Sequence, residues 1–317
     1  MNIIEMNDVC RSFGNDKETM FAVNHLNLAV PQGSVYGLLG ANGAGKTTSI
    51  RMLISHLKPD SGEIRVLGEN PAAFSEKTRK QIAYISENMQ VPYWMSIEDA
   101  VGFCKPLYPN WDDGLLQKLL NLFNLKMSKR YEESSKGQRR AICIILAMCQ
   151  NPDVLIMDEP ASGLDTLSRR HFLSEILNIA CNENKTVLFS SHILGDIERT
   201  VDRVAILLQG QRILEGELDS LKESVKRISL RGETIGELPQ QLFQTLRIVQ
   251  EKDAVQWIVT DYTEEKMNRL YQLLPENISA ETEGFNLEEL FLVVNNDREI
   301  GDIKEFCDDN SPLISNS

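Results

Sequence analysis

The segment from Gly40 to Thr48 contains residue types and spacings suited to binding the phosphates of a nucleotide. Its glycines precede Lys46 and Thr47 in the pattern of a phosphate-binding P-loop. Glycine lets backbone N–H groups approach a triphosphate with positive φ angles, and a helix that follows adds donors at its N-terminus. We expect Lys46 to reach the β- and γ-phosphates and the Thr47 hydroxyl to bind Mg²⁺. The expected nucleotide-binding positions are Gly40, Asn42, Gly43, Gly45, Lys46, Thr47 and Thr48.

A strand and a helix must flank this loop to hold it in place. The apolar run Val35–Leu39 predicts a buried strand before the loop. After the loop, Ile50, Leu53, Ile54 and Leu57 recur at helical spacing, which predicts a helix through this segment. Strand, glycine loop and helix in this order predict a nucleoside triphosphate site rather than a loop that merely turns.

Two further predicted strands end in polar residues that could join the same site. Val154–Met157 is a continuous apolar run, typical of a central parallel strand covered on both faces, and Asp158 and Glu159 follow it. Thr186–Phe189 predicts another strand, which leads into Ser190–His192. Ligands of open α/β sheets bind at the carboxyl ends of the strands, so we expect these residues near the glycine loop.

Length and composition indicate one large and one small domain. The chain has 317 residues, of which 42% are hydrophobic, enough for a substantial core. The longest apolar run, Ala141–Cys149, is shorter than a membrane-spanning helix needs. Met1–Glu5 lacks the basic and apolar regions of a signal peptide, so we expect a soluble protein that is not exported.

Charge and cysteine spacing narrow the possible classes of protein. The formal charge of −13 argues against a broad nucleic-acid surface, and we expect no nucleic-acid partner. The six cysteines form no C-x-x-C pair, and Cys143 and Cys149 lie in an apolar segment. A reduced cytosol fits this pattern, and a zinc site does not.

Other segments predict elements outside the parallel sheet. Residues 1–30 read as an antiparallel β region, where Phe13 either stacks on a base or packs on the sheet. Residues from about 90 to 150 predict an α-helical insertion, with Ser96 as an N-cap. Beyond residue 220 the pattern weakens to short strands (227–230, 245–249 and 255–260) and helices (264–274 and 286–293). We assign residues 1–220 to the main domain, 221–294 to a small α+β domain and 295–317 to an acidic, disordered tail.

Five motifs in order resemble those of the nucleotide-binding subunit of ATP-binding-cassette (ABC) transporters, over roughly residues 1–220. They are the Walker A loop Gly40–Thr48, the signature Ser135–Gln138, the Walker B segment Val154–Pro160, the D-loop Ser162–Asp165 and the switch histidine His192. The resemblance implies an α/β fold: a P-loop NTPase core with an antiparallel β subdomain, an α-helical insertion and a small C-terminal α+β appendage. It also implies ATP and Mg²⁺ as ligands and ATP hydrolysis as the activity.

The resemblance assigns roles to individual residues. Asp158 would orient the Mg²⁺ shell, and Glu159 would polarise the attacking water as a general base. His192 would hydrogen-bond the γ-phosphate and the water. The expected catalytic residues are Glu159, His192 and Lys46, and the expected metal site comprises Thr47, Asp158 and Glu87.

In the family, the signature helix points its N-terminus at the γ-phosphate bound to a second subunit. Here that helix begins near Gly137, and Ser135, Gly137 and Gln138 would face the partner's ATP. Asp165 would lie near the dimer seam. A complete site therefore needs two ATPase subunits. One chain holds a full set of motifs, which favours a homodimer, with a heterodimer as the alternative.

The chain departs from the family pattern in the signature and in the Q-loop. Ser134 replaces the usual leucine, and Lys136 replaces a glycine. Glu87 stands at the usual glutamine of the Q-loop, with Gln90 available in a shifted register. A carboxylate can bind metal or its waters but cannot donate a hydrogen bond. Arg140–Ala141 stands where a Gln-Arg pair is commoner, and the sequence offers no functional account of it.

Two weaker features suggest the branch whose ATPases pair with separate ABC-2-type permeases, including Ytr-type subunits. They are Tyr108–Asp112 in the insertion and Asn286–Phe291 near the C-terminus. In that setting the partner is an integral membrane permease, and the transporter is an exporter. Pro92–Met95 and Phe103 would receive a coupling helix of the permease, or else pack inside the insertion. The protein would be cytoplasmic, held at the inner face of the membrane by the permease.

Two other functions compete with transport. A soluble ABC ATPase acting in translation or DNA repair is the first, although such proteins usually carry two cassettes, coiled coils or zinc sites. A regulatory module that binds ATP with little hydrolysis is the second, and Glu159 and His192 speak against it.

Overall fold

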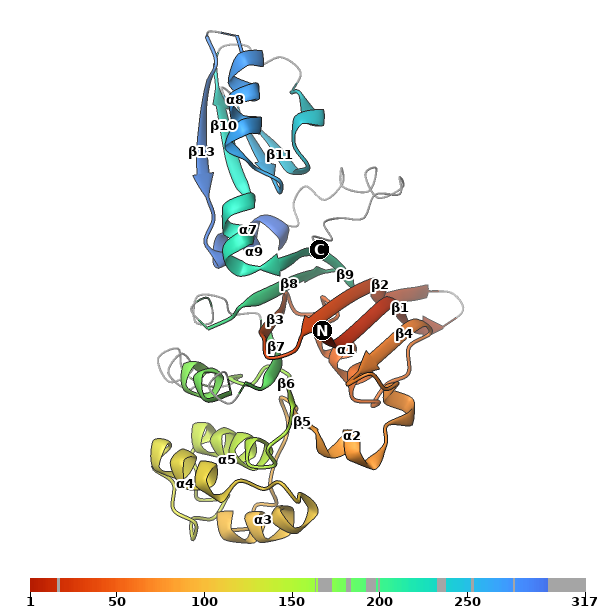
Figure 1. Ribbon diagram of the computed structural model, residues 1–317, viewed down its shortest axis with the longest axis vertical. Helices are drawn as coiled ribbons and strands as arrows, with labels where there is room; N and C mark the ends of the chain where they lie inside the picture. Colours follow the sequence, from red (N-terminus) through yellow and green to blue (C-terminus); the bar gives the residue numbers. More distant parts are fainter. Residues whose placement is uncertain are drawn as a thin grey trace. The chain divides into compact units, whose positions relative to one another are not determined.

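The computed structural model describes residues 1–15, 18–162, 164, 173–180, 184–191, 198, 200–232, 238–251, 254–275 and 277–295. Within these ranges the chain forms two compact units, which divide between Leu214 and Glu215, slightly before the boundary expected at residue 220. Figure 1 shows the elements of each unit.

A sheet of mostly parallel strands forms the centre of the first unit. Its strands are β3 (Val35–Gly40), β5 (Ile82–Ile85), β6 (Val154–Met157), β7 (Thr186–Ser191), β8 (Arg203–Leu208) and β9 (Gln211–Glu217), in the order β5-β6-β7-β3-β8-β9. β3 pairs in parallel with β7 and β8, and β6 with β5 and β7. β3, β6 and β7 are buried along their whole length, as their apolar runs predict.

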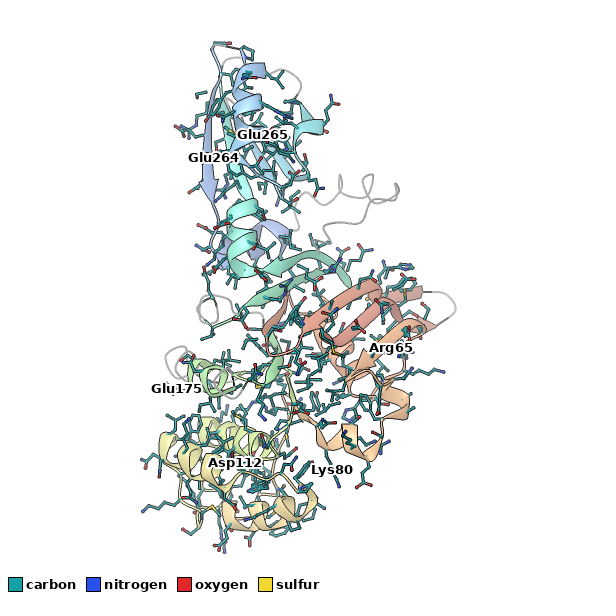
Figure 2. All side chains as sticks on the ribbon, in the orientation of Figure 1. Arg65, Lys80, Asp112, Glu175, Glu264 and Glu265 are labelled. Atoms are coloured by element: carbon teal, nitrogen blue, oxygen red, sulfur yellow. The ribbon has the colours of Figure 1, made fainter. Side chains whose placement is uncertain are left out.

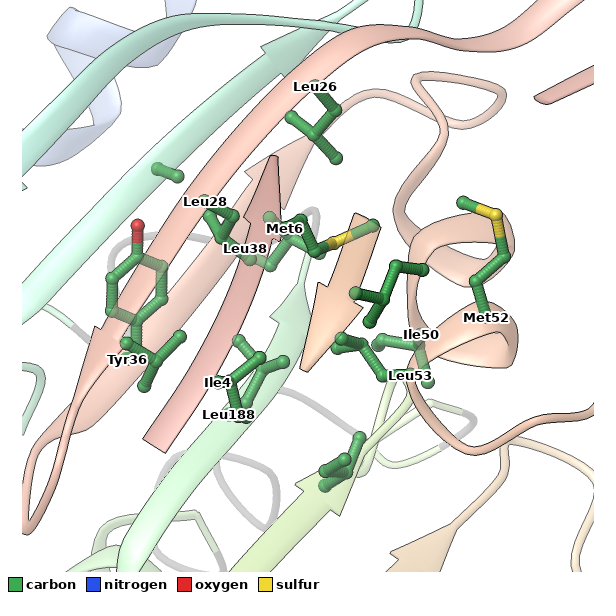
Figure 3. Close-up of a cluster of buried hydrophobic side chains, with 14 of the residues drawn as sticks. Ile4, Met6, Leu26, Leu28, Tyr36, Leu38, Ile50, Met52, Leu53 and Leu188 are labelled. Carbon is green, nitrogen blue, oxygen red and sulfur yellow. The ribbon is translucent and has the colours of Figure 1, made fainter. Parts of the chain in front are cut away.

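The N-terminal part of the chain forms an antiparallel sheet. Its strands are β1 (Asn2–Asn15), β2 (Glu18–Pro31) and β4 (Ser61–Val66), in the order β2-β1-β4. Figure 3 shows their inward side chains, such as Ile4, Met6 and Leu26, in one buried cluster with Leu38 of β3 and Leu53. The antiparallel sheet is thus attached to the parallel sheet through a shared apolar core, which fixes the glycine loop between them.

The helix after the glycine loop, α1 (Lys46–Leu53), is shorter than the apolar spacing predicts. Ser55 has φ 62°, and the N–H groups of His56 and Leu57 return to the carbonyl of Arg51. This turn ends the helix, because left-handed backbone cannot continue a right-handed one. Ile54 and Leu57 still pack against the core. The spacing therefore identified core residues correctly but placed the helix end too late.

The expected α-helical insertion is present. It contains α3 (Ile97–Cys104), α4 (Asp113–Leu122) and α5 (Lys136–Met148), preceded by η1 (Pro71–Ala73) and α2 (Glu76–Lys80) and including η2 (Lys105–Leu107). Ser96 caps α3 in a reciprocal capping box with Asp99, as predicted. Asp112, labelled in Figure 2, caps α4 by accepting from the N–H of Leu115 at 2.8 Å.

The second unit is a small α+β structure. It contains α7 (Leu218–Ser224), β10 (Lys226–Arg231), η3 (Gln240–Leu242), β11 (Thr245–Glu251), β12 (Ala254–Val259), α8 (Glu264–Leu273), β13 (Ser279–Gly284) and α9 (Leu287–Asn295). The antiparallel sheet has the order β11-β12-β10-β13. Trp257 of β12 is fully buried in its core. Glu264 and Glu265, labelled in Figure 2, lie in the first turn of α8, where negative charge complements the helix dipole.

Sequence patterns missed β9, α7 and β13. β13 is largely exposed and rich in charged and small residues, so it lacks the alternation that identifies a strand. It forms a strand because its backbone pairs antiparallel with that of β10. Within the described ranges, no helix combines the length and the apolar character needed to cross a bilayer.

Candidate functional site

The glycine loop has the backbone geometry that binds phosphate. It joins the end of β3 to the start of α1, and Gly43 and Gly45 have φ angles of 85° and 102°. A Cβ atom on Gly45 would lie 2.4 Å from the carbonyl oxygen of Ala22, and one on Gly40 would lie 2.8 Å from that of Leu207. A side chain at Gly43 would meet nothing within 4 Å, so this side of the loop is open. The loop thus leaves room for a ligand while close packing fixes it from behind.

Lys46 lies inside this loop and close to a carboxylate. Its side chain is 6% exposed, and its Nζ donates to the carbonyls of Gly40 at 2.7 Å and Ala41 at 3.2 Å. Nζ also lies 3.5 Å from Oε1 of Glu159. Burial lowers the pKa of Lys46, and the carboxylate of Glu159 opposes that shift. The hydrogen bonds to Gly40 and Ala41 thus hold the ammonium inside the loop.

Asp158 meets Thr47 and Ser190 at the carboxyl ends of neighbouring strands. Oδ1 of Asp158 accepts from Oγ1 of Thr47 at 3.1 Å and from Oγ of Ser190 at 2.7 Å. Asp158 is 3% exposed and directly follows β6, whereas Ser190 lies near the carboxyl end of the neighbouring strand β7. A carboxylate and a hydroxyl at this separation are hard oxygen ligands of the kind Mg²⁺ prefers, so the donor set fits that ion.

Glu159 adopts an unusual backbone conformation beside this pair. Its φ angle is 46°, and it precedes Pro160, which further restricts its backbone. Its N–H donates to Oγ of Ser190 at 2.8 Å, and its side chain is 15% exposed. Strained residues persist where their surroundings hold them, and they cluster at functional sites.

Ser190 was expected near the glycine loop but was given no role, and its hydroxyl bonds the carboxylate of Asp158 and the N–H of Glu159. The sequence signal that could have identified Ser190 was a polar residue near the carboxyl end of a buried strand, at the edge of the sheet where ligands bind. His192, Gly163 and Asp165 lie outside the described residues.

The N-terminus of α5 is closed by its own side chains. Oγ of Ser135 accepts from the N–H of Gln138 at 3.2 Å, and Oε1 of Gln138 accepts from the N–H of Ser135 at 3.2 Å. The helix begins at Lys136, one residue before the expected start. A Cβ atom on Gly137 would lie 3.2 Å from Leu164, so glycine permits this close approach. The signature segment therefore forms the N-cap of α5, which begins close to the predicted position.

Two departures in the signature have local explanations. Ser134 is buried where a leucine is usual, and its hydroxyl is satisfied by donating to the carbonyl of Arg130 at 3.0 Å. Lys136 is exposed at the start of α5. Its charge therefore reaches solvent next to the helix N-terminus.

Phe13 lies on β1, and Glu87 follows β5. The Phe13 ring on β1 is 48% exposed, and the guanidinium carbon of Arg11 lies 4.9 Å from its centre. About half of the ring is thus open to a ligand. Oε1 of Glu87 accepts from the hydroxyl of Ser162 at 2.9 Å, so the carboxylate bonds to the segment that follows Glu159.

These features define the class of the protein. A glycine loop between a parallel strand and a helix holds a buried lysine, and a carboxylate from a second strand lies against the loop threonine. This is the architecture of a P-loop nucleoside triphosphatase.

Comparisons with known proteins identify the family. A model of the ABC transporter family matches residues 23–162. The bacitracin transport ATP-binding protein BcrA of Bacillus licheniformis is 33% identical over 70% of this chain and 72% of its own length. The ABC transporter ATP-binding protein NatA of Bacillus subtilis (strain 168) is 32% identical over 70% of this chain and 92% of its own.

A solved structure, described as that of an ATP-binding subunit of an ABC transporter, superposes with a TM-score of 0.60 and 30% identity, over 70% of this chain and 92% of its own. The chain belongs to the ATP-binding subunits of ABC transporters. It is an ATPase that binds ATP and serves transport, and the competing function in translation or DNA repair is not supported.

Proposed function

We propose that this chain pairs with a second ATPase subunit around two ATP molecules and that ATP hydrolysis there drives a separate membrane permease. The observation that carries the proposal is the meeting of four side chains at one edge of the sheet. Nζ of Lys46 lies 3.5 Å from Glu159, and Oγ1 of Thr47 lies 3.1 Å from Asp158. The full set of motifs in one chain favours a homodimer, and a heterodimer is the alternative.

In this proposal the loop residues bind the triphosphate. Lys46 neutralises the β- and γ-phosphate oxygens, while the backbone N–H groups from Asn42 to Thr48 surround them. Thr47 and Asp158 would hold Mg²⁺, which supplies charge neutralisation for the phosphates when it is bound. Phe13, an exposed ring, would stack on the adenine. Glu87 would contribute to the metal site directly or through water.

Glu159 acts as the general base in this proposal. Its carboxylate would accept a proton from the attacking water, because a water polarised in this way is a better nucleophile. The strained backbone at φ 46° aims this side chain, and Ser190 fixes its N–H. His192 would bond the γ-phosphate and the water, and this role remains a prediction.

The partner subunit would receive the N-terminus of α5. Ser135, Gly137 and Gln138 would face the partner's γ-phosphate, supported by the dipole of a 13-residue helix. The exposed Lys136 adds a positive charge in the same direction. Asp165 would lie near the seam between the subunits.

The permease would dock on an exposed aromatic surface of the insertion. Trp94 is 67% exposed, Phe103 66% and Tyr93 49%, so these rings do not form the insertion's core. Exposed aromatic side chains of this kind mark sites where another protein binds. Binding there would hold the protein at the inner face of the membrane. A relative named as a Nod factor export ATP-binding protein supports an exporter, which we assign to the ABC-2 branch.

The Glu159→Gln variant tests the site and the dimer together. Glutamine cannot accept the proton, so hydrolysis should stop while ATP still binds, and the ATP-bound dimer should accumulate. Size-exclusion chromatography with ATP and Mg²⁺ would measure the dimer, and a phosphate-release assay the hydrolysis. Wild-type turnover in this variant would refute the role of Glu159. Co-purification with a membrane protein, rather than with ribosomes or DNA, would support the permease partner.

A further inference from the structure

Arg140 is a buried arginine that the proposed mechanism leaves without a role. It is 7% exposed and lies in the first turns of α5. A guanidinium is a rigid planar group with five N–H donors, so it can fix several acceptors at once. Burial lowers the pKa of Arg140, and the charge of Glu87 is among those that oppose the shift. A group this basic stays charged, so its surroundings must compensate the charge.

The hydrogen bonds described for Arg140 end on backbone carbonyls of two separate segments. On the segment after β5, Nη1 donates to Ser86 at 2.6 Å and to Glu87 at 3.2 Å. On the segment after β6, Nε donates to Pro160 at 2.7 Å, and Nη2 donates to Asp158 at 3.3 Å and Glu159 at 3.2 Å. β5 and β6 are parallel neighbours, so Arg140 joins the two segments just where the sheet ends.

The Glu87 side chain makes a second connection between the same segments. Its carboxylate accepts from the hydroxyl of Ser162, whose N–H in turn donates to the carbonyl of Glu159 at 3.1 Å. Arg140 and Glu87 therefore hold the loop 158–162 from two sides.

The loop held in this way contains the strained residue. Glu159 has φ 46° and precedes a proline, and Arg140 bonds the carbonyls of the residues before it, at it and after it. Three fixed carbonyls determine the orientation of the peptide planes and hence the direction of the Glu159 side chain. Removing the guanidinium would let this backbone relax toward an ordinary conformation.

Building on the ATP site proposed above, we propose that Arg140 locks the 158–162 loop to the 86–87 segment, beside the Glu87–Ser162 hydrogen bond, and that it is the positioning residue that aims Glu159. Because Arg140 is part of α5, the aim of Glu159 depends on where α5 lies. A shift of α5 would therefore change the orientation of the Glu159 carboxylate.

Substitutions of Arg140 test the clamp. Arg140→Gln should lower kcat at least about tenfold and change the Kd for ATP by less than about twofold, because the carbonyls of Gly40 and Ala41 hold Lys46 independently of Arg140. Arg140→Lys, which keeps the charge and three donors, should recover part of kcat.

Arg139 provides the matched control. This neighbouring arginine donates to the carbonyls of Tyr131 at 3.0 Å and Glu132 at 2.8 Å and lies over the ring of Tyr93, away from the 158–162 loop. Arg139→Gln should leave basal kcat within about twofold of wild type. Hydrogen–deuterium exchange should rise in 158–162 for Arg140→Gln and stay unchanged there for Arg139→Gln.

Two outcomes would overturn the proposal: a wild-type kcat in Arg140→Gln, or a parallel loss of kcat and ATP binding. If Arg140→Gln does not fold, the kcat of Arg140→Lys and its Kd for ATP decide the question by the same criteria. Absence of hydrolysis in the wild-type protein would instead refute the proposed ATPase site, so the two failures are distinguishable.

Discussion

Replacing Ser190 with alanine probes the contacts that join the two carboxylate residues of the site. Ser190 is fully buried, and its hydroxyl donates to Asp158 at 2.7 Å and accepts from the N–H of Glu159 at 2.8 Å. Alanine removes both hydrogen bonds at once and leaves a cavity too small for a new partner. We therefore expect both stability and turnover to fall.

The contacts set the size of the expected effect. A hydrogen bond to a charged group contributes about 1.5–3 kcal/mol, and a buried N–H left without a partner costs about 1–3 kcal/mol. Asp158 retains the hydroxyl of Thr47, which limits the first loss. A total of about 3 kcal/mol corresponds to a fall in Tm of about 6–12 °C for a unit of this size. We expect kcat to fall too, since the carboxylate of Asp158 and the backbone N–H of Glu159 each lose a contact that orients them.

Circular dichroism during heating measures the change in Tm, and a phosphate-release assay at saturating ATP measures kcat. Ser49→Ala is the matched control, because Ser49 is equally buried but its hydroxyl makes one neutral bond, to the carbonyl of Gly45 at 3.0 Å. That carbonyl keeps the N–H of Ser49 at 2.9 Å, so the control should cost about 1 kcal/mol or less. Equal Tm shifts in the two variants would refute the reasoning.

Three further predictions follow from other parts of the chain. Trp257→Ala should destabilise the second unit by about 3–5 kcal/mol in urea unfolding, since this buried indole packs edge-to-face on Phe243 at 5.2 Å; an unchanged midpoint would contradict its role. Phe13→Ala should raise the Kd for ATP about 5- to 100-fold at unchanged saturated kcat, measured by titration and turnover, because a base loses its stacking partner; equal affinity would exclude stacking. Hydrogen bonds from the Ser12 backbone N–H and hydroxyl hold the pKa of Asp60 below its usual value. The stability that these bonds give the folded protein is therefore complete above about pH 4, the pKa in the unfolded chain, and is lost as the pH falls through the lower pKa of the folded state. Asp60→Asn should therefore flatten the acid limb of a Tm–pH profile, and an unaltered profile would count against this link.

Much of the fold could be predicted from the sequence because local patterns encode it directly. The run Val154–Met157 predicted a strand covered on both faces, and all four residues are buried. Ser96 predicted the start of a helix, and its hydroxyl caps α3. The spacing of Gly40, Lys46 and Thr47 predicted a phosphate loop, since glycines are required where the backbone takes positive φ or packs closely. Each of these signals lies within a few residues of the chain.

Elements without such signals were missed or misplaced. β13 is a polar edge strand, and its pairing with β10 rather than its own residues makes it a strand. The end of α1 depends on the left-handed turn at Ser55, which the apolar spacing of Ile54 and Leu57 hides. Propensity and periodicity are weak where partners or turns decide the backbone conformation.

The sequence by itself determined that this chain has a phosphate loop, buried parallel strands and the ordered motifs of an ABC ATPase. Only the tertiary structure decided that Ser190 holds both Asp158 and Glu159 and that Arg140 clamps the loop around them. Ser190 lies 31 residues from Glu159 and Arg140 lies 54 residues from Ser86. These residues meet because the sheet order β5-β6-β7-β3 brings distant strand ends to one edge, and that order depends on packing of the whole core.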